Sequence, residues 1–469
     1  MLPLVEFPQI VQHYAPWFES VFSAEALVQF QRYLSGLIIS NNKTVDGINR
    51  LFVIENRNQS SLNRLLTASP FSEAALNRQR LALLNSLEGT RVKPKGVLSV
   101  DDTLLTHYGR HFDEIALLYD PVEKRYTWAH NLVNLHYSDD QTDYPLYFQL
   151  WKPADLDKIE QGLQAAGIHL RESKFALKES DPRKWRQYLL GVWRRKQSRP
   201  EVAALYQSKL LIARQLLRRW VDENPELKLP VTFDNWYTQP AFCRFLDREL
   251  QLPYVGTLAS DDQVILKRGR LTLEEFAEQL KQEHLQAVAK GGPPVFHKIG
   301  ITYKGEKETY YSYCRTHRIH NFGKQRLVIN FNQPDLSDSP SFYNSNRLVW
   351  QSVGITRIRR HRWPVEVYHQ EGKEEGLDKY QVRDFRAISR HIGFVAVAYS
   401  LLRAAPHDEA LLHKLQRQLE MDLDGSTPFW RRATQAQSLW ALACFISAGL
   451  TQGQSLRELM APLLAAVCY

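Results

Sequence analysis

Three acidic residues stand where carboxylates could hold a divalent metal ion. Asp102 and Asp234 follow short apolar runs, at 97–100 and 229–233, that each predict a buried strand. Ligands and metal ions bind at strand ends in α/β sheets, although a single acid there is more often a turn or cap residue. Glu366 lies in a segment that predicts a helix. It offers the third oxygen ligand that a Mg²⁺ site built on two aspartates needs.

Glu366 belongs to a stripe of ionisable side chains. At about 100° per residue, Arg362, Glu366, His369 and Lys373 fall on one side of a helix. Ion pairs on a solvent-facing helix are common and contribute little to stability. Four arginines are concentrated at 357–362, however, and arginine beside a carboxylate suits the binding of a phosphate group. The stripe therefore favours phosphodiester chemistry over a solvated helix face.

The positive charge of the chain is concentrated in its middle. The 469 residues include 60 Lys and Arg against 51 Asp and Glu, a net charge of +9. Residues 1–90 are balanced, whereas 183–220 hold eleven basic residues and one acid. Basic residues with interleaved Trp and Tyr suit a phosphate backbone with some base stacking, although a solvated helix face or a protein contact would give the same pattern. The residues of this stretch that we expect to bind DNA are Arg194, Arg195 and Lys196.

Composition excludes several classes of protein. A hydrophobic content of 44 % excludes a disordered chain. The longest apolar stretches, near 391–402 and 438–450, are shorter than the roughly 20 residues that span a bilayer, so no membrane partner is expected. No basic segment precedes the first apolar residues, which argues against a signal peptide. The four cysteines form no CxxC pair, so we expect the cytoplasm rather than an oxidising compartment.

The periodicity predicts the elements that must position these residues. Residues 20–90 are predicted to be helical, with two short helices capped by Thr44 and by Ser60 or Ser61. Their order has the outline of a helix-turn-helix, for which a plain helical bundle is the alternative. Strands are predicted at 97–100, 113–119, 125–137, 145–151, 229–233, 254–258, 263–267, 299–303, 308–316, 326–331 and 347–353. A surface loop is predicted at 332–346, and helices at 153–166, 200–220, 272–288, 361–374, 384–403, 407–420 and 429–448.

The chain resembles the DDE transposases of bacterial insertion sequences, in the RNase H-like group with the Y-R-E-K signature. The spacing R-x3-E-x6-K is matched by Arg362, Glu366 and Lys373, and the two aspartate motifs by VLSVDDT and VTFDNWY. The resemblance covers most of 95–403. It implies an α/β fold, in which an RNase H-like catalytic core carries a β-rich insertion between helical N- and C-terminal domains. The resemblance implies a helical DNA-binding domain at 1–90 and a C-terminal helical region at 404–469. It divides the catalytic core into 91–257 and 351–403, with the β-rich insertion at 258–350 between them.

The sequence departs from the family pattern at one position and leaves the first aspartate open between two residues. The signature tyrosine, which helps to hold a DNA phosphate, is replaced here by Arg359, and arginine can bind a phosphate by charge. The first aspartate is either Asp101 or Asp102. Asp102 directly precedes Thr103, as in the family pattern, and is our choice. Only one of the two can face a metal pocket, because neighbouring side chains of a strand point to opposite faces.

The resemblance implies a site and a reaction. Asp102, Asp234 and Glu366 would hold two Mg²⁺ ions, for which Mn²⁺ can substitute. Arg362 and Lys373 would grip phosphates beside the cut. An aromatic residue of the insertion stabilises a flipped base in this group, and Trp350 is the candidate, with a core position as its alternative.

The implied protein is a transposase that cuts the ends of its element and joins them to target DNA. Its partners would be double-stranded DNA, both the terminal inverted repeats and the target, and a second copy of the chain in a synaptic complex. One alternative is a domesticated DNA-binding or regulatory protein with the same fold. Another is a metal-dependent nuclease of that fold without transposition.

Overall fold

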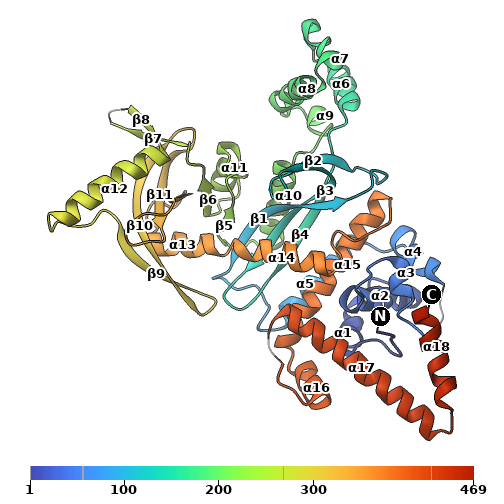
Figure 1. Cartoon of the computed structure of the whole chain (residues 1–469). Coiled ribbons are helices and arrows are strands. Elements are labelled where there is room, and N and C mark those ends of the chain that lie inside the picture. The colour runs from blue at the N-terminus through green and yellow to red at the C-terminus, as the bar shows by residue number, and fades with distance from the viewer. Residues whose placement is uncertain (1, 55–57, 268, 424, 469) are drawn as a thin grey trace.

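The computed structural model describes residues 2–54, 58–267, 269–423 and 425–468. Within them a twelve-stranded sheet runs through the molecule (Figure 1). Its first strands are β1 (Val97–His107), β2 (Ala116–Asp120), β3 (Arg125–Ser138), β4 (Asp143–Trp151), β5 (Val231–Phe233) and β6 (Tyr254–Leu258). Its later strands are β7 (Gln263–Leu266), β8 (Gly269–Thr272), β9 (His297–Tyr303), β10 (Glu306–Ile319), β11 (Gly323–Phe331) and β12 (Ser341–Ser345). The order is β2-β3-β1-β5-β6-β12-β11-β10-β7-β8, with β4 beside β3 and β9 beside β10. This mixed α/β architecture confirms the expected fold class.

The strands of 258–350, the segment expected as an insertion and called by that name below, continue the sheet instead of standing apart from it. β12 pairs with β6 on one side and with β11 on the other. The surface loop predicted at 332–346 is confirmed for 332–340 but is wrong for 341–345, which form β12. The strand predicted at 347–353 is wrong, because these residues form no strand and a helix begins at Ser352. Pairing on both sides buries Phe342 and Asn344 and overrides the polar composition of that segment.

One long helix, α15 (Phe385–Ala404), organises the helices at both ends of the chain. The N-terminal helices are α1 (Gln9–Tyr14), η1 (Ala15–Phe18), α2 (Ala24–Ile39), α3 (Val45–Asn49), α4 (Gln59–Thr67) and α5 (Glu73–Ser86). The C-terminal ones are η4 (Ala405–His407), α16 (Glu409–Leu419), α17 (Thr427–Thr451) and α18 (Leu456–Cys468). The buried ring of Phe394 in α15 contacts Phe22, Phe30 and Phe71. Both ends of the chain therefore share one apolar core with the sheet.

The caps of the predicted helix-turn-helix are only partly as expected. The Thr44 side chain accepts a hydrogen bond from the Gly47 N–H, which confirms it as the cap of α3. The second cap is Asn58 and not Ser60 or Ser61, since its side chain accepts the Ser60 N–H. Residues 55–57 of the connection lie outside the described residues. Whether α3 and α4 bind DNA stays a prediction.

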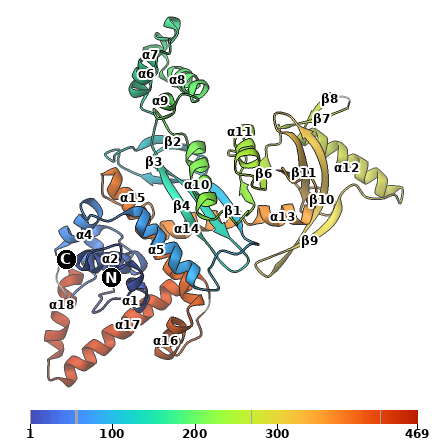
Figure 2. The ribbon, with the colours of Figure 1, turned by 180° about the vertical axis from the view of Figure 1, so that it is seen from behind.

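A small helical unit projects from the sheet in both views (Figures 1 and 2). It contains α6 (Leu156–Ala165), η2 (Glu172–Lys174), α7 (Leu177–Ser180), α8 (Pro182–Lys196) and α9 (Pro200–Ala203). Its own apolar cluster includes Trp185, Leu189 and Trp193. The helix predicted over 200–220 is interrupted: α9 ends at Ala203, and α10 (Lys209–Glu223) returns to the sheet.

Five further helices belong to the described fold: α11 (Pro240–Arg244), η3 (Phe245–Glu249), α12 (Leu273–Ala289), α13 (Ser352–Arg360) and α14 (Trp363–Glu374). α13 contacts β9 and β10 of the insertion, whereas α14 contacts β1, β3 and β4 (Figure 1). In the part of the chain that the structure describes, we find no helix with the length and apolar character that crossing a membrane requires.

Candidate active site

Parallel pairing of β1 and β5 brings two aspartates together. Val100 stands opposite Phe233 in the register, and the next residue on each strand is an aspartate, Asp101 and Asp234. Partners in a parallel register point to the same face of a sheet. β1 is also longer than predicted, because β3 pairs with it from Val97 to His107. Asp101 and Asp102 therefore lie within the strand and not after its end.

Strand alternation separates Asp101 from Asp102. The Ser99 hydroxyl donates to the backbone carbonyl of His361 at 3.0 Å, so this face of β1 looks toward the junction of α13 and α14. Asp101 lies two residues further on and shares that face. Its Oδ2 accepts a hydrogen bond from Arg362 Nη1 at 2.6 Å. Asp101 thus faces the helix that carries Glu366.

Asp102 points to the opposite face, toward α10. Its Oδ2 pairs with Lys209 Nζ at 2.9 Å and accepts from Asn131 Nδ2 at 2.6 Å. Its Oδ1 accepts the Tyr237 hydroxyl at 2.8 Å. Three donors therefore hold the Asp102 carboxylate, and the structure brings Asp101, the other residue of the pair, beside Arg362.

Arg362 links two of the carboxylates. A break at His361 divides the helix predicted over 361–374, and Arg362 becomes the N-cap residue of α14 with helical backbone angles. Pro364 occupies the first turn, where the missing N–H costs nothing. The predicted spacing of four residues holds, and Arg362 Nη2 donates to Glu366 Oε1. The guanidinium of Arg362 therefore bridges Asp101 and Glu366.

Burial makes Asp101 and Asp234 resist ionisation, so both carboxyls would be stabilised by further positive charge. Burial raises the pKa of Asp101 to about 7, with Arg362 opposing the shift and Asp234 and Asp102 adding to it. Burial also raises the pKa of Asp234, while the Tyr237 N–H and Arg362 lower it and Asp102 raises it. A buried group of carboxylates with one shared arginine favours the approach of further positive charge.

The side chains of this site are of the type that binds a metal ion, but in this structure they are too far apart to hold one together. Asp101, Asp234 and Glu366 are carboxylates, the hard oxygen donors that suit Mg²⁺. Across the described ranges, no group of three His, Cys, Asp or Glu residues stands close enough to hold a metal ion as arranged. Arg362 stands between Asp101 and Glu366. Gathering the three carboxylates around an ion requires Arg362 to release Glu366.

The aspartates of β1 and the aspartate after β5 line one open groove of about 990 Å³. Its lining includes Asp101, Asp102, Asp234, Lys209, Trp236 and Lys373. We call it the carboxylate groove. Lys373 comes from α14, seven residues after Glu366, as the predicted stripe requires. Its large volume and open form suit a polymer more than a small molecule enclosed on all sides.

The other residues that the sequence predicts to bind DNA do not line this groove. Arg359 is near it: its Nε donates to Thr257 Oγ1 at 2.8 Å, and burial lowers its pKa to about 10, with Arg362 adding to the shift. Trp350 is half-buried, packs against a small cluster formed around Val255, and does not appear among the described residues that line the carboxylate groove. Three more, Arg194, Arg195 and Lys196, are exposed at the end of α8.

Sequence reasoning missed two residues of the groove. Lys209 belongs to the basic stretch but was not distinguished from its ten basic neighbours. Tyr237 stands in the second aspartate motif, three residues after Asp234, where the sequence pattern gives it no role of its own. Both are identified only by their contacts with Asp102, which depend on how α10 and the turn after β5 fold against β1.

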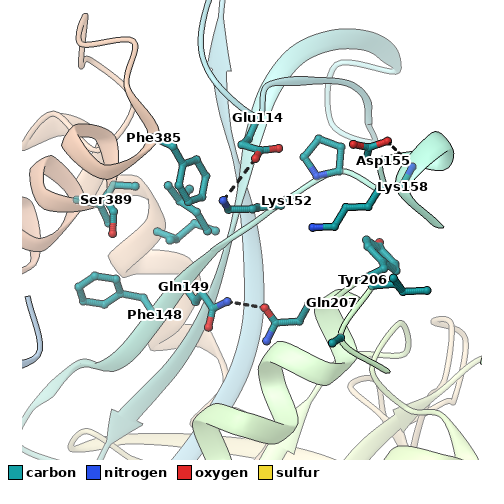
Figure 3. Close-up of a pocket in the computed structure, with 16 residues that line it drawn as sticks. Glu114, Phe148, Gln149, Lys152, Asp155, Lys158, Tyr206, Gln207, Phe385 and Ser389 are labelled. Carbon is teal, nitrogen blue, oxygen red and sulfur yellow. Dashed lines mark hydrogen bonds and ion pairs between the residues drawn. The ribbon is translucent and has the colours of Figure 1, made fainter. Parts of the chain in front are cut away.

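A second hollow, of about 410 Å³, opens at the edge of the sheet near the end of β4 (Figure 3). Lys152 pairs there with Glu114 at 3.4 Å, and Gln149 donates to Gln207 at 2.8 Å. Its lining includes none of the three carboxylates Asp101, Asp234 and Glu366. The candidate active site is therefore the carboxylate groove and not this hollow.

Comparison with known families agrees with this geometry. Residues 17–279 match the family described as DDE superfamily endonuclease. Because the match spans more than half of the chain, the protein belongs to this family, which confirms the expected DDE-type protein. The matched span contains Asp101, Asp102 and Asp234 and ends before Glu366. No curated protein matches the chain.

Proposed function

We propose that this protein is a DNA transposase that cuts the ends of its element and joins them to target DNA. Family membership supports an endonuclease acting on DNA. One observation carries the assignment of the site: Arg362 bridges Asp101 and Glu366, while Asp101 and Asp234 line the same open groove. The proposed first carboxylate is Asp101, in place of the expected Asp102.

The roles follow from position. Asp101, Asp234 and Glu366 would hold two divalent ions, Mg²⁺ or Mn²⁺, which activate the attacking oxygen and stabilise the leaving oxygen. Arg362 is close enough to bind the phosphate at the cut once Glu366 is released. Lys373 lines the same groove and contributes a second cation.

The proposed DNA path extends beyond the groove. The exposed basic triplet at 194–196 would bind the phosphate backbone from the projecting unit, and α3 and α4 would read the terminal inverted repeats. Two copies of the chain would hold two element ends together. Arg359 would support the phosphate contact in the place of the signature tyrosine. Trp350 is better explained as a packing residue, because it belongs to an apolar cluster.

Substitution of each acid tests the assignment. Asp101→Asn, Asp234→Asn and Glu366→Gln should each slow Mg²⁺-dependent cleavage of an inverted-repeat duplex by about 1,000-fold, since a metal ion contributes several kcal/mol at the transition state. Binding of the duplex should persist. Asp102→Asn should retain most activity, because the amide oxygen still accepts from Tyr237. The exposed Asp261 provides a matched control, Asp261→Asn.

Two results would change the assignment. Loss of cleavage in Asp102→Asn with an active Asp101→Asn would return the first ligand to Asp102. A wild-type protein that binds the duplex but does not cut it, with or without Mg²⁺ or Mn²⁺, would favour the regulatory DNA-binding alternative.

A further inference from the structure

We propose that a line of exposed basic side chains on the insertion binds the phosphate backbone of the target duplex. The proposal rests on the proposed function and assigns its second DNA substrate to a surface of its own. The side chains are Arg270 of β8, Arg318 of β10 and Lys324 of β11, together with Arg347 after the end of β12. We call these four residues the basic row.

Strand pairing places three residues of the basic row in line. Lys324 stands opposite Arg318 in the register, Arg318 opposite Ile265, and Ile265 opposite Arg270. Residues opposite each other in neighbouring strands point to the same face of the sheet. Three strand spacings of about 4.8 Å make this line about 14 Å long, which is the length of about four base pairs.

The segment that contains Arg347 is fixed beside this line. β12 runs antiparallel to β11 and therefore ends where β11 begins. Arg326 Nε of β11 donates to the Trp350 carbonyl at 2.8 Å, and Thr316 Oγ1 of β10 donates to the Leu348 carbonyl at 3.4 Å. These two bonds hold the chain after β12 against the sheet, so Arg347 extends the basic row past the edge of β11.

The charge of the basic row is not neutralised within the chain. All four side chains are exposed, and in the described parts of the molecule none of them pairs with a carboxylate. Arg347 makes one long contact, of 3.5 Å, with the Gln251 carbonyl, which leaves its charge in place. Arg360 of α13, in contrast, pairs with Glu308 at 2.9 Å. The basic row therefore offers cations to an anion from outside.

The two faces of this end of the sheet differ in charge. The face opposite the basic row is covered by α12, because Phe276 of α12 packs against Tyr313 of β10 in one apolar cluster. Between Glu274 and Glu283, α12 carries four acids and one lysine. A polyanion is therefore attracted to the face that carries the basic row and repelled from the other.

The position of the basic row fits the target duplex. α3 and α4, which we propose to read the element ends, lie on one side of β1, β3 and β4, and the insertion lies on the other (Figures 1 and 2). Joining brings the element end and the target together at the carboxylates, so the surface away from the end-reading helices is the one left for the target. Cations that contact phosphates position a duplex without reading its sequence, which suits a DNA that is not the element's own.

Binding of a random-sequence duplex, measured by fluorescence anisotropy in EDTA, tests the surface. The double variant Arg318→Gln/Lys324→Gln should weaken binding about 10-fold at 100 mM salt and lower the slope of log affinity against log salt by about 2, since each lost phosphate contact removes about 0.9. The matched control is Arg315→Gln/Lys290→Gln. It removes the same charge from two exposed residues on the α12 side of the sheet and should leave the slope unchanged.

A joining assay tests the choice of target. With element ends that are already cut, the basic-row variant should join them to target DNA about 10-fold more slowly than the wild type when target is limiting. Its rate of cutting an inverted-repeat duplex should stay at the wild-type value. Both double variants should keep the wild-type melting temperature, because all four replaced side chains are exposed.

The outcomes separate this proposal from the proposed function. An unchanged salt slope, or equal effects of the two double variants, would overturn the basic row as a DNA surface. Equal losses of cutting and joining would assign it to the element end and overturn the target assignment. A wild-type protein that neither cuts nor joins would overturn the proposed function, whereas the anisotropy experiment in EDTA would still report on the basic row.

Discussion

Replacing Asp143 with asparagine should destabilise the fold, because this carboxylate joins three parts of the molecule. Asp143 is 1 % exposed. Its Oδ2 pairs with Lys304 Nζ of the insertion at 2.7 Å, and its Oδ1 with Arg403 Nη2 of α15 at 3.1 Å. His136 Nε2 of β3 lies 3.5 Å away. The insertion, the sheet and the central helix therefore meet at one buried charge.

The expected loss is about 3–5 kcal/mol, the range for removing one partner of a buried ion pair. Arg403 would be left buried, with Glu371 at 3.6 Å as its remaining carboxylate. Lys304→Met should cost less than half as much, because the Lys304 side chain is 33 % exposed and solvent screens its contribution. It serves as the matched control.

The effect should depend on pH in a defined direction. Burial alone would raise the pKa of Asp143, but Arg403, His136 and Lys304 together hold it well below the usual value. A carboxyl with a lowered folded pKa stabilises the protein above its unfolded pKa, about 3.9, and this contribution is lost as the pH falls through the folded pKa. The difference between wild type and Asp143→Asn should stay constant from pH 5 to 8 and shrink below about pH 4.

Urea unfolding followed by tryptophan fluorescence and circular dichroism measures both effects. A midpoint for Asp143→Asn equal to that of the wild type at pH 7 would refute the role of the buried charge. A difference that grows as the pH falls below about 4 would refute the sign of the linkage.

Three further predictions follow from other parts of the structure. Burial lowers the pKa of both His361 and His391 to about 4. Each histidine should therefore remove about 1.4 kcal/mol of stability per pH unit as the pH falls below about 6.5. Thermal melting between pH 7 and 5 checks this, and a melting temperature that does not change with pH would contradict it. Reversing the charge of the triplet at 194–196 should weaken DNA binding and reduce the salt slope by up to about 3, measured as affinity against salt; an unchanged slope would identify a solvated face. Gly256→Ala should destabilise the fold by about 1–3 kcal/mol through overpacking, because a Cβ there would lie 2.9 Å from Phe233 and 2.7 Å from Asn344. Chemical denaturation measures this loss, and an unchanged stability would show that these side chains move aside.

Local sequence patterns correctly indicated what depends on neighbours in the chain. The four-residue spacing of Arg362 and Glu366 produces a side-chain ion pair at the start of α14, and the strand predicted at 254–258 is β6 without change. Helical period and strand composition act over a few residues, so a sequence carries them directly. The family match confirms that the chain is a DDE-type protein. Arg362, Glu366 and Lys373 lie outside the matched residues, so the Y-R-E-K group stays a prediction.

The choice between neighbouring residues required the folded molecule. Asp101 and Asp102 are identical side chains next to each other, and only the pairing of β1 with β3 and β5 decides which face each one takes. β12 became a strand because β6 and β11 supply partners on both sides. Lys209 reached Asp102 because α10 packs against the sheet. The sequence by itself determined which chemical groups were present and how they were spaced along each element; the long-range hydrogen bonds of the sheet decided which of them meet, because those bonds join residues far apart in the chain.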